Sequence, residues 1–212
     1  MFVNNHGWIC TYVNFRMVLE FDLNWCSHIE SKYSVLFFDM DGTIVKSDIA
    51  NSLAYKKAIV EVFGEWPIVN ELSNWRITRD TLRTIIPSLK MNDFDKIVEL
   101  KESYYEQFLC ELQLNNDILD IINKYQGLKL LVLVTNSSKK RAMAILEFYD
   151  LIDKFDFLVF QNNLDSLWEN KYLKALAVAL VDPEKVVCFD DDDIEIAKAQ
   201  DAGIKAIVKV TK

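Results

Sequence analysis

Five short, nearly continuous apolar runs constrain the fold of this chain more than any other feature of its sequence. A strand that is buried on both faces of a parallel sheet has such a sequence, because neither of its faces meets water. The runs lie at 33–38, 129–134, 155–160, 185–189 and 205–210. Between the later runs lie helical patterns at 138–148, 170–181 and 194–202. This alternation predicts right-handed βαβ units, and therefore an α/β fold built on a parallel sheet.

The long stretch between the first and second runs contains no convincing strand. Its helical patterns lie near 48–63, 71–87, 93–112 and 115–125. An all-helical segment inserted after the first strand predicts a second module, a cap, at 47–115. The sheet core then comprises 33–46 and 116–212. Residues 1–32 form an N-terminal extension of unclear role: a strand or hairpin added to the fold, an ordered extension, or translation from an upstream start.

Composition argues against several kinds of partner and location. The 212 residues include 32 acidic and 24 basic side chains, and a net charge of −8 matches the phosphate backbone of nucleic acid poorly. No run approaches the roughly 18 to 20 consecutive apolar residues of a membrane helix, so we expect no membrane association. The four cysteines form no C-x-x-C pair and no signal peptide is visible, so we expect a cytoplasmic protein with reduced thiols.

Polar residues follow three of the predicted strands at the point where each strand ends. Asp39 and Asp41 follow the first strand, and Thr135 and Asn136 follow the second. Asp190 and Asp191 follow the fourth. Ligands of open parallel sheets bind at the carboxyl ends of the strands, so we expect these residues to converge. Two carboxylates at ~4 Å repel by about 4 kcal/mol, and a hard divalent cation such as Mg²⁺ is the natural counter-charge.

The aspartates at 190–193 admit a second interpretation. Four consecutive aspartates could form a solvated acidic turn, because aspartate favours the N-terminus of a helix. We favour metal binding for Asp190 and Asp191, which stand at the strand end, and helix capping for Asp192 and Asp193.

The remaining candidates are each ambiguous when taken alone. Asp39 and Asp41 suggest a nucleophile with a neighbouring acid/base that points the same way if the strand continues, but an aspartate–glycine turn gives the same pattern. Thr135 and Asn136 offer a hydroxyl and backbone N–H groups to phosphate oxygens, or form an ordinary helix cap. Lys171 could balance the aspartates and hold phosphate, or lie on the surface.

Three motifs together resemble the haloacid dehalogenase superfamily of phosphohydrolases. Residues 37–43 read F-F-D-M-D-G-T, residues 132–136 read V-L-V-T-N, and residues 186–191 read V-V-C-F-D-D. The resemblance covers about 34–210 and implies a Rossmann-like parallel-sheet core. The helical insert resembles the small helical cap of the phosphoglycolate phosphatase and β-phosphoglucomutase branch.

The resemblance implies a role for each motif residue. Asp39 would be the nucleophile and a Mg²⁺ ligand, and Asp41 the general acid/base whose backbone carbonyl also binds the metal. Asp191 would complete the metal site with support from Asp190. Asp41 also argues for phosphoryl transfer, because dehalogenases lack the second aspartate of the first motif.

Thr135 and Lys171 would bind the transferring phosphoryl group. The lysine departs from the usual pattern of this branch, which is K-P-x-P, since no proline follows Lys171. Lys171 opens the helical pattern at 170–181, and Lys174 is the alternative.

The sequence therefore predicts a Mg²⁺-dependent phosphatase that acts on a small phosphorylated metabolite, as a monomer or a homodimer. A sugar-phosphate mutase that shares the aspartyl-phosphate is the first alternative. A catalytically inactive regulatory or interaction protein on the same scaffold is the second.

Overall fold

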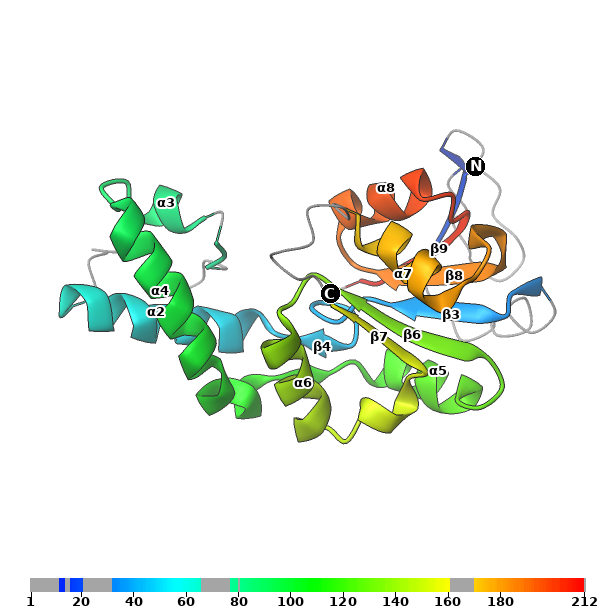
Figure 1. Ribbon diagram of the computed structural model, residues 1–212, viewed down its shortest axis with the longest axis horizontal. Helices are drawn as coiled ribbons and strands as arrows, with labels where there is room; N and C mark the ends of the chain where they lie inside the picture. The colour runs from blue at the N-terminus through cyan, green and yellow to red at the C-terminus, as the bar shows by residue number, and fades with distance from the viewer. Residues whose placement is uncertain are drawn as a thin grey trace. The chain divides into compact units, whose positions relative to one another are not determined.

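The structure is a computed structural model, and it describes residues 12–13, 16–20, 32–65, 77–79, 81–160 and 170–211. Contacts along and across the chain divide it into two compact units. The sheet unit comprises Met1–Val45 and Leu114–Lys212, and the helical unit comprises Lys46–Gln113 (Figure 1).

The sheet unit is built on one seven-stranded sheet. Its strands are β1 (Tyr12–Val13), β2 (Arg16–Glu20), β3 (Val35–Phe38), β6 (Leu130–Thr135), β7 (Phe157–Phe160), β8 (Val186–Asp190) and β9 (Ala206–Lys209). Their order is β1-β2-β9-β8-β3-β6-β7, and the pairings are parallel except that of β1 with β2. The predicted α/β fold with a parallel sheet is confirmed, and β3 lies between β8 and β6.

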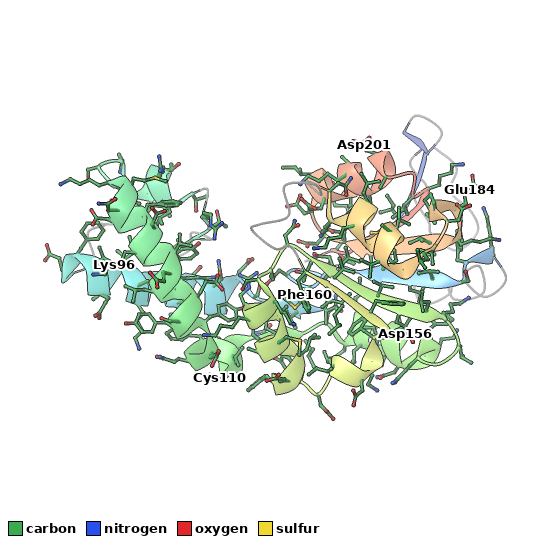
Figure 2. The ribbon with its side chains drawn as sticks, viewed as in Figure 1. Lys96, Cys110, Asp156, Phe160, Glu184 and Asp201 are labelled. Carbon is green, nitrogen blue, oxygen red and sulfur yellow. The ribbon has the colours of Figure 1, made fainter. Side chains whose placement is uncertain are left out.

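Helices cover both faces of this sheet (Figure 1). They are α5 (Asn116–Tyr125), α6 (Lys139–Phe148), α7 (Lys171–Ala179) and α8 (Asp193–Asp201), with the short 3₁₀ turns η4 (Ile152–Lys154) and η5 (Pro183–Lys185). α7 and α8 lie on one face, and α5 and α6 on the other. All four residues of β3 are buried, and apolar side chains pack between the sheet and the helices on each of its faces (Figure 2). Burial on both faces is the physical reason for the continuous apolar runs.

The described residues of the helical unit are mostly helical. They form α2 (Asp48–Phe63), α3 (Leu82–Ile85), α4 (Met91–Tyr104) and the 3₁₀ segment η3 (Tyr105–Glu111). An apolar cluster that includes Tyr55, Ile59 and Ile97 forms its core. A separate two-stranded sheet pairs β4 (Val45–Lys46) with β5 (Gln113–Leu114).

Two helices differ from the sequence prediction. The pattern at 71–87 predicted one helix, but 71–76 lies outside the described residues and α3 begins only at Leu82. Thr78 and Thr81 hydrogen-bond to each other, with 2.8 Å between Thr78 N and Thr81 Oγ1, and such side-chain bonds compete with helix formation. The pattern at 93–112 ends as an α-helix at Tyr104, and η3 contains a non-helical residue at Phe108.

The N-terminal extension contributes strands to the sheet. β2 runs parallel to β9 and pairs Met17 with Ala206 and Glu20 with Lys209, while β1 turns back against β2. Among the residues that the structure describes, no helix is long and apolar enough to cross a membrane.

Candidate active site

The candidate site lies at the carboxyl ends of β8, β3 and β6, which are neighbours in the sheet. Asp39 follows β3 directly, Asp190 is the last residue of β8, and Thr135 is the last residue of β6. The backbone N–H of Asp39 donates to the carbonyl of Phe189 at 2.9 Å, which ties the start of the loop after β3 to β8. Parallel pairing thus brings together three residues that are far apart in the sequence.

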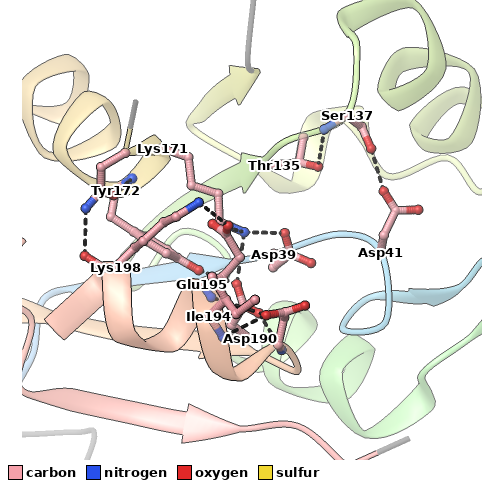
Figure 3. A network of polar contacts seen from close by, with 12 residues as sticks. Asp39, Asp41, Thr135, Ser137, Lys171, Tyr172, Asp190, Ile194, Glu195 and Lys198 are labelled. Carbon is pink, nitrogen blue, oxygen red and sulfur yellow. Dashed lines mark hydrogen bonds and ion pairs between the residues drawn. The ribbon is translucent and has the colours of Figure 1, made fainter. Parts of the chain in front are cut away.

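Lys171, the first residue of α7, bridges two of the carboxylates (Figure 3). Its Nζ lies 2.6 Å from Oδ1 of Asp39 and 2.9 Å from Oδ2 of Asp190. A third carboxylate, that of Glu195 on α8, lies 3.7 Å from the same nitrogen. Lys171, Asp39 and Asp190 are all buried, so the ammonium offsets carboxylate repulsion where water does so least.

Hydrogen bonds fix the position of Asp190 from two sides. Its Oδ1 accepts the backbone N–H of Asp192 at 2.8 Å, and its Oδ2 accepts the hydroxyl of Tyr172 in addition to Lys171. The Tyr172 ring is fully buried in the core between α7 and the sheet. Asp190 is therefore a fixed anion that holds the Lys171 ammonium beside Asp39.

Three of the aspartates form a candidate metal site. Carboxylate oxygens of Asp39, Asp190 and Asp191 lie within 4.8 Å of one another. Gly42 makes room for Asp191, because a Cβ at Gly42 would lie 2.4 Å from Asp191 Oδ2, and Gly42 also has a positive φ of 93°. Lys171 offsets only part of the negative charge of these three carboxylates. This all-oxygen, acidic site fits Mg²⁺, with Asp39 and Asp191 the residues that would hold the ion and Asp190 beside them.

The pKa values reflect the same balance of charges. Burial raises the pKa of Asp39 well above its ordinary value, Lys171 lowers it, and the Asp190 and Asp41 carboxylates raise it. Burial alone would lower the pKa of Lys171, but Asp39, Asp190 and Glu195 raise it above its ordinary value. Lys171 is therefore a fixed cation, and an added positive charge near Asp39 would favour the ionised carboxylate.

Asp41 does not point the same way as Asp39. The strand ends at Phe38, and Asp41 lies in a turn in which Gly42 N donates to the carbonyl of Val45 at 2.8 Å. The Asp41 carboxylate instead faces Ser137, whose hydroxyl donates to Oδ2 at 2.5 Å (Figure 3). The alternation expected for a continuing strand fails here because the chain has already left the sheet.

Asp41 also pairs with a residue of α6. Arg141 Nη2 lies 2.6 Å from Asp41 Oδ2, and Arg141 donates to the Ser137 hydroxyl as well. Ser137, on the loop after β6, and Arg141, in the first turn of α6, therefore account for the orientation of Asp41.

The two residues of the second motif differ in environment. Thr135 is buried, and its Oγ1 accepts the backbone N–H of Ser137 at 3.0 Å, which shapes the loop after β6. The Asn136 side chain is exposed, and the contacts described for the site join it to neither Asp39 nor Lys171.

The structure also distinguishes Lys171 from Lys174 and gives separate contacts to Asp192 and Asp193. Lys174 donates to the carbonyl of Phe160 at 2.9 Å, at the end of β7, so Lys171 is the lysine that meets the aspartates. Helix capping is confirmed for Asp192, whose carboxylate accepts backbone N–H groups in the first turn of α8. Asp193 pairs with Lys209 at 2.6 Å instead.

Neither Tyr172 nor Arg141 was expected at the site from the sequence. The apolar helical pattern at 170–181 predicted Tyr172 as core, and its ring is core, but its hydroxyl reaches Asp190. One usable signal exists for Arg141, which stands where a helix that begins at Ser138 prefers an acidic residue.

Comparison with known proteins agrees with this geometry. A profile of the haloacid dehalogenase-like hydrolases matches residues 36–209. The phosphorylated carbohydrates phosphatase of Thermotoga maritima is 30% identical over 186 residues, with 82% of this chain and 84% of the relative covered. The fructose-1-phosphate phosphatase YqaB of Escherichia coli is 24% identical, with 83% and 96% covered.

A solved structure of another protein has a similar fold. A Thermotoga maritima protein provisionally named a β-phosphoglucomutase superposes with a TM-score of 0.63 at 25% identity, covering 84% of this chain and 86% of that one. The profile match spans most of the chain, including Asp39, which follows β3, and Asp190, the last residue of β8. On this evidence, the chain belongs to the family of haloacid dehalogenase-like hydrolases.

Proposed function

We propose that this protein is a Mg²⁺-dependent phosphatase of small phosphorylated sugars, with Asp39 as the nucleophile. The observation that carries the proposal is the cluster of Asp39, Asp190 and Asp191, in which Lys171 bridges the two buried members, Asp39 and Asp190. A buried arrangement of this kind costs folding free energy, which a function explains and a structural role does not. The names of the two curated relatives, both phosphatases of phosphorylated sugars, support the substrate class.

In the proposed reaction, Asp39 attacks phosphorus and the bond from phosphorus to the sugar oxygen breaks, leaving an aspartyl-phosphate. Asp41 donates a proton to the departing sugar oxygen and then takes a proton from the water that hydrolyses the intermediate. Lys171, which lies beside Asp39, contacts a phosphoryl oxygen. Thr135 and Asn136 also bind the phosphoryl group. When bound, Mg²⁺ would supply positive charge that offsets the carboxylates and the phosphoryl oxygens.

The helical unit has a proposed role in the same reaction. We propose that the insert predicted at 47–115, which corresponds to Lys46–Gln113, is a cap that contacts the sugar and excludes water during turnover. A small metabolite as substrate, a cytoplasmic location, and a monomer or homodimer complete the proposal.

A sugar-phosphate mutase is the second candidate, favoured by the likeness to the protein provisionally named a β-phosphoglucomutase. The two differ in what accepts the phosphoryl group, since a phosphatase gives it to water and a mutase returns it to a sugar. Product analysis with sugar monophosphates and with bisphosphates decides between them: free phosphate indicates the phosphatase, and an isomerised sugar phosphate indicates the mutase.

The decisive experiment is a panel of phosphorylated metabolites and one aryl phosphate, assayed with Mg²⁺ and with EDTA. We expect hydrolysis that requires Mg²⁺ and that Asp39→Asn abolishes. Asp193→Asn is the matched control, because it makes the same chemical change at a surface aspartate that pairs with Lys209. Absence of turnover on the whole panel, or turnover that survives Asp39→Asn, would refute the proposal.

A further inference from the structure

The ion pair of Asp41 with Arg141 is the feature of the site that the proposed function leaves unexplained. Arg141 Nη2 and the Ser137 hydroxyl converge on one oxygen of Asp41, at 2.6 Å and 2.5 Å. Exposed side-chain fractions of 16% for Arg141 and 19% for Asp41 place the pair largely out of water. Charge-assisted bonds in such a setting fix the orientation of a carboxylate.

Helix stability does not account for an arginine at this position. Arg141 is the third residue of α6, and its backbone N–H donates to the hydroxyl of the N-cap, Ser138, at 3.3 Å. A glutamate or glutamine here would complete a capping box, and the helix dipole favours acidic over basic side chains in the first turn. The guanidinium thus stands against the preference of the helix, and the contact it gains there is with Asp41.

The orientation held by this contact directs the Asp41 carboxylate to Ser137 rather than to Asp39. Asp39 lies in the three-aspartate cluster and faces Lys171, whereas the Asp41 carboxylate is directed to Ser137 (Figure 3). In an in-line transfer to Asp39, the departing oxygen lies beyond phosphorus. A general acid must come within about 2.6 to 3.2 Å of that oxygen, whereas Ser137 and Arg141 hold Asp41 Oδ2 at the loop after β6.

We propose that Arg141 is a positioning residue that, with Ser137, holds the Asp41 carboxylate away from Asp39, so that this ion pair opens in every turnover. The inference rests on the proposed function, which gives Asp41 its role in proton transfer. It assigns to Arg141 control over how often Asp41 faces the reacting group, and therefore over the rate of aspartyl-phosphate formation.

Single-turnover kinetics, with a sugar phosphate that the protein hydrolyses, test the role of Arg141 directly. We expect Arg141→Met to raise the rate constant for aspartyl-phosphate formation about fivefold, the equivalent of one weak ion pair, and Arg141→Lys to fall between it and the wild type. Lys139→Met is the matched control, because it removes a cation from an exposed position in the same helical turn and should leave the rate unchanged.

A double-mutant cycle separates positioning from a structural role. Asp41→Asn should slow the reaction, and adding Arg141→Met to it should change nothing further, because Arg141 acts through Asp41. An equal effect of Arg141→Met with and without Asp41→Asn, or a lower rate for Arg141→Met alone, would overturn the inference while leaving the phosphatase intact.

Crystal structures supply a readout that needs no turnover. We expect the Asp41 carboxylate to face Ser137 in the wild type and to turn toward Asp39 in Arg141→Met and, in part of the molecules, in Arg141→Lys. The same orientation in all three proteins would overturn the inference. A wild type that hydrolyses no sugar phosphate fails the proposed function separately, and the structures still decide whether Arg141 holds Asp41.

Discussion

Lys171→Met should destabilise the protein strongly at neutral pH, and the size of the loss follows from what the ammonium contacts. Methionine keeps the length and apolar character of the side chain but removes the charge. The buried carboxylates of Asp39 and Asp190 then face each other without the cation that lies 2.6 and 2.9 Å from them. We expect the free energy of unfolding to fall by about 3 to 5 kcal/mol, the usual cost of removing one partner from a buried ion pair.

An independent estimate gives a similar magnitude. Lys171 donates two hydrogen bonds to charged acceptors, and each such bond contributes about 1.5 to 3 kcal/mol. The more distant Glu195, at 3.7 Å, is also bound to Lys198 at 2.6 Å and adds little. Two bonds therefore account for about 3 to 6 kcal/mol, in agreement with the figure for a broken buried pair.

The loss should grow as the pH rises. The pKa of Asp39 is already raised by burial and is lowered by Lys171, so removing Lys171 raises this pKa further. A carboxylate whose pKa is higher in the folded than in the unfolded protein stabilises the fold at low pH and loses that contribution as the pH rises through the folded value. The variant should therefore lie closer to the wild type at about pH 5 than at about pH 8.

Urea unfolding in EDTA at the two pH values measures the effect, with EDTA present so that no divalent cation replaces the missing charge. Lys174→Met is the matched control, since it removes a lysine of the same helix that donates to the Phe160 carbonyl. It should cost about 1 kcal/mol, with no growth toward high pH. A loss below about 1 kcal/mol for Lys171→Met, or one that does not depend on pH, would refute the reasoning about this cluster.

Three further substitutions test single contacts of the site. Tyr172→Phe removes one hydroxyl from Asp190 and should cost about 1 to 2 kcal/mol in urea unfolding; unchanged stability would show that this bond adds nothing. Gly42→Ala would place a Cβ 2.4 Å from Asp191 Oδ2, so the Mg²⁺ concentration for half-maximal hydrolysis should rise about tenfold, and an unchanged value would separate Asp191 from the metal. Asp192→Ala removes a helix cap and should cost about 1 kcal/mol without changing kcat, whereas a large fall in kcat would place Asp192 in the site.

The core strands could be predicted because their environment acts on every residue. All four residues of β3 and all five of β8 are buried, so β3 and the first four residues of β8 appear in the sequence as unbroken apolar runs. β2 differs, because its sequence R-M-V-L-E begins and ends with a charged residue and offers only a short apolar run. The sequence of the extension therefore left a strand as one of three alternatives.

The site could be predicted as far as strand ends determine it. Asp39, Thr135 and Asp190 meet because β3, β6 and β8 are neighbours, and order in a parallel sheet is enough for this. The choice between Lys171 and Lys174 depends on where α7 lies along the sheet. Positions three residues apart share nearly the same helix face, so periodicity could not separate the two lysines.

The contacts made by side chains with two functions could not be predicted. Tyr172 packs its ring in the core and directs its hydroxyl at Asp190, and helical periodicity reports only the ring. Asp41 was expected to follow the alternation of β3, but the turn at Gly42 redirects its carboxylate to Ser137. The orientation of Asp41 depends on where the chain leaves β3, and the ends of helices and strands are the features that a sequence defines least well.

The four consecutive aspartates show why net charge is a poor guide to what a site binds. Asp190 is neutralised by Lys171, Asp191 lies in the candidate metal cluster, Asp192 caps α8, and Asp193 pairs with Lys209 on the surface. The three aspartates of the cluster carry more negative charge than the Lys171 ammonium offsets, so the site favours a cation such as Mg²⁺. Burial and the neighbouring carboxylates raise the pKa of Asp39, and a bound cation would lower it, so cation binding and ionisation of Asp39 should promote each other. An acidic protein can then accept a phosphate, because the local balance at β3 and β8 governs the encounter more than the total of −8.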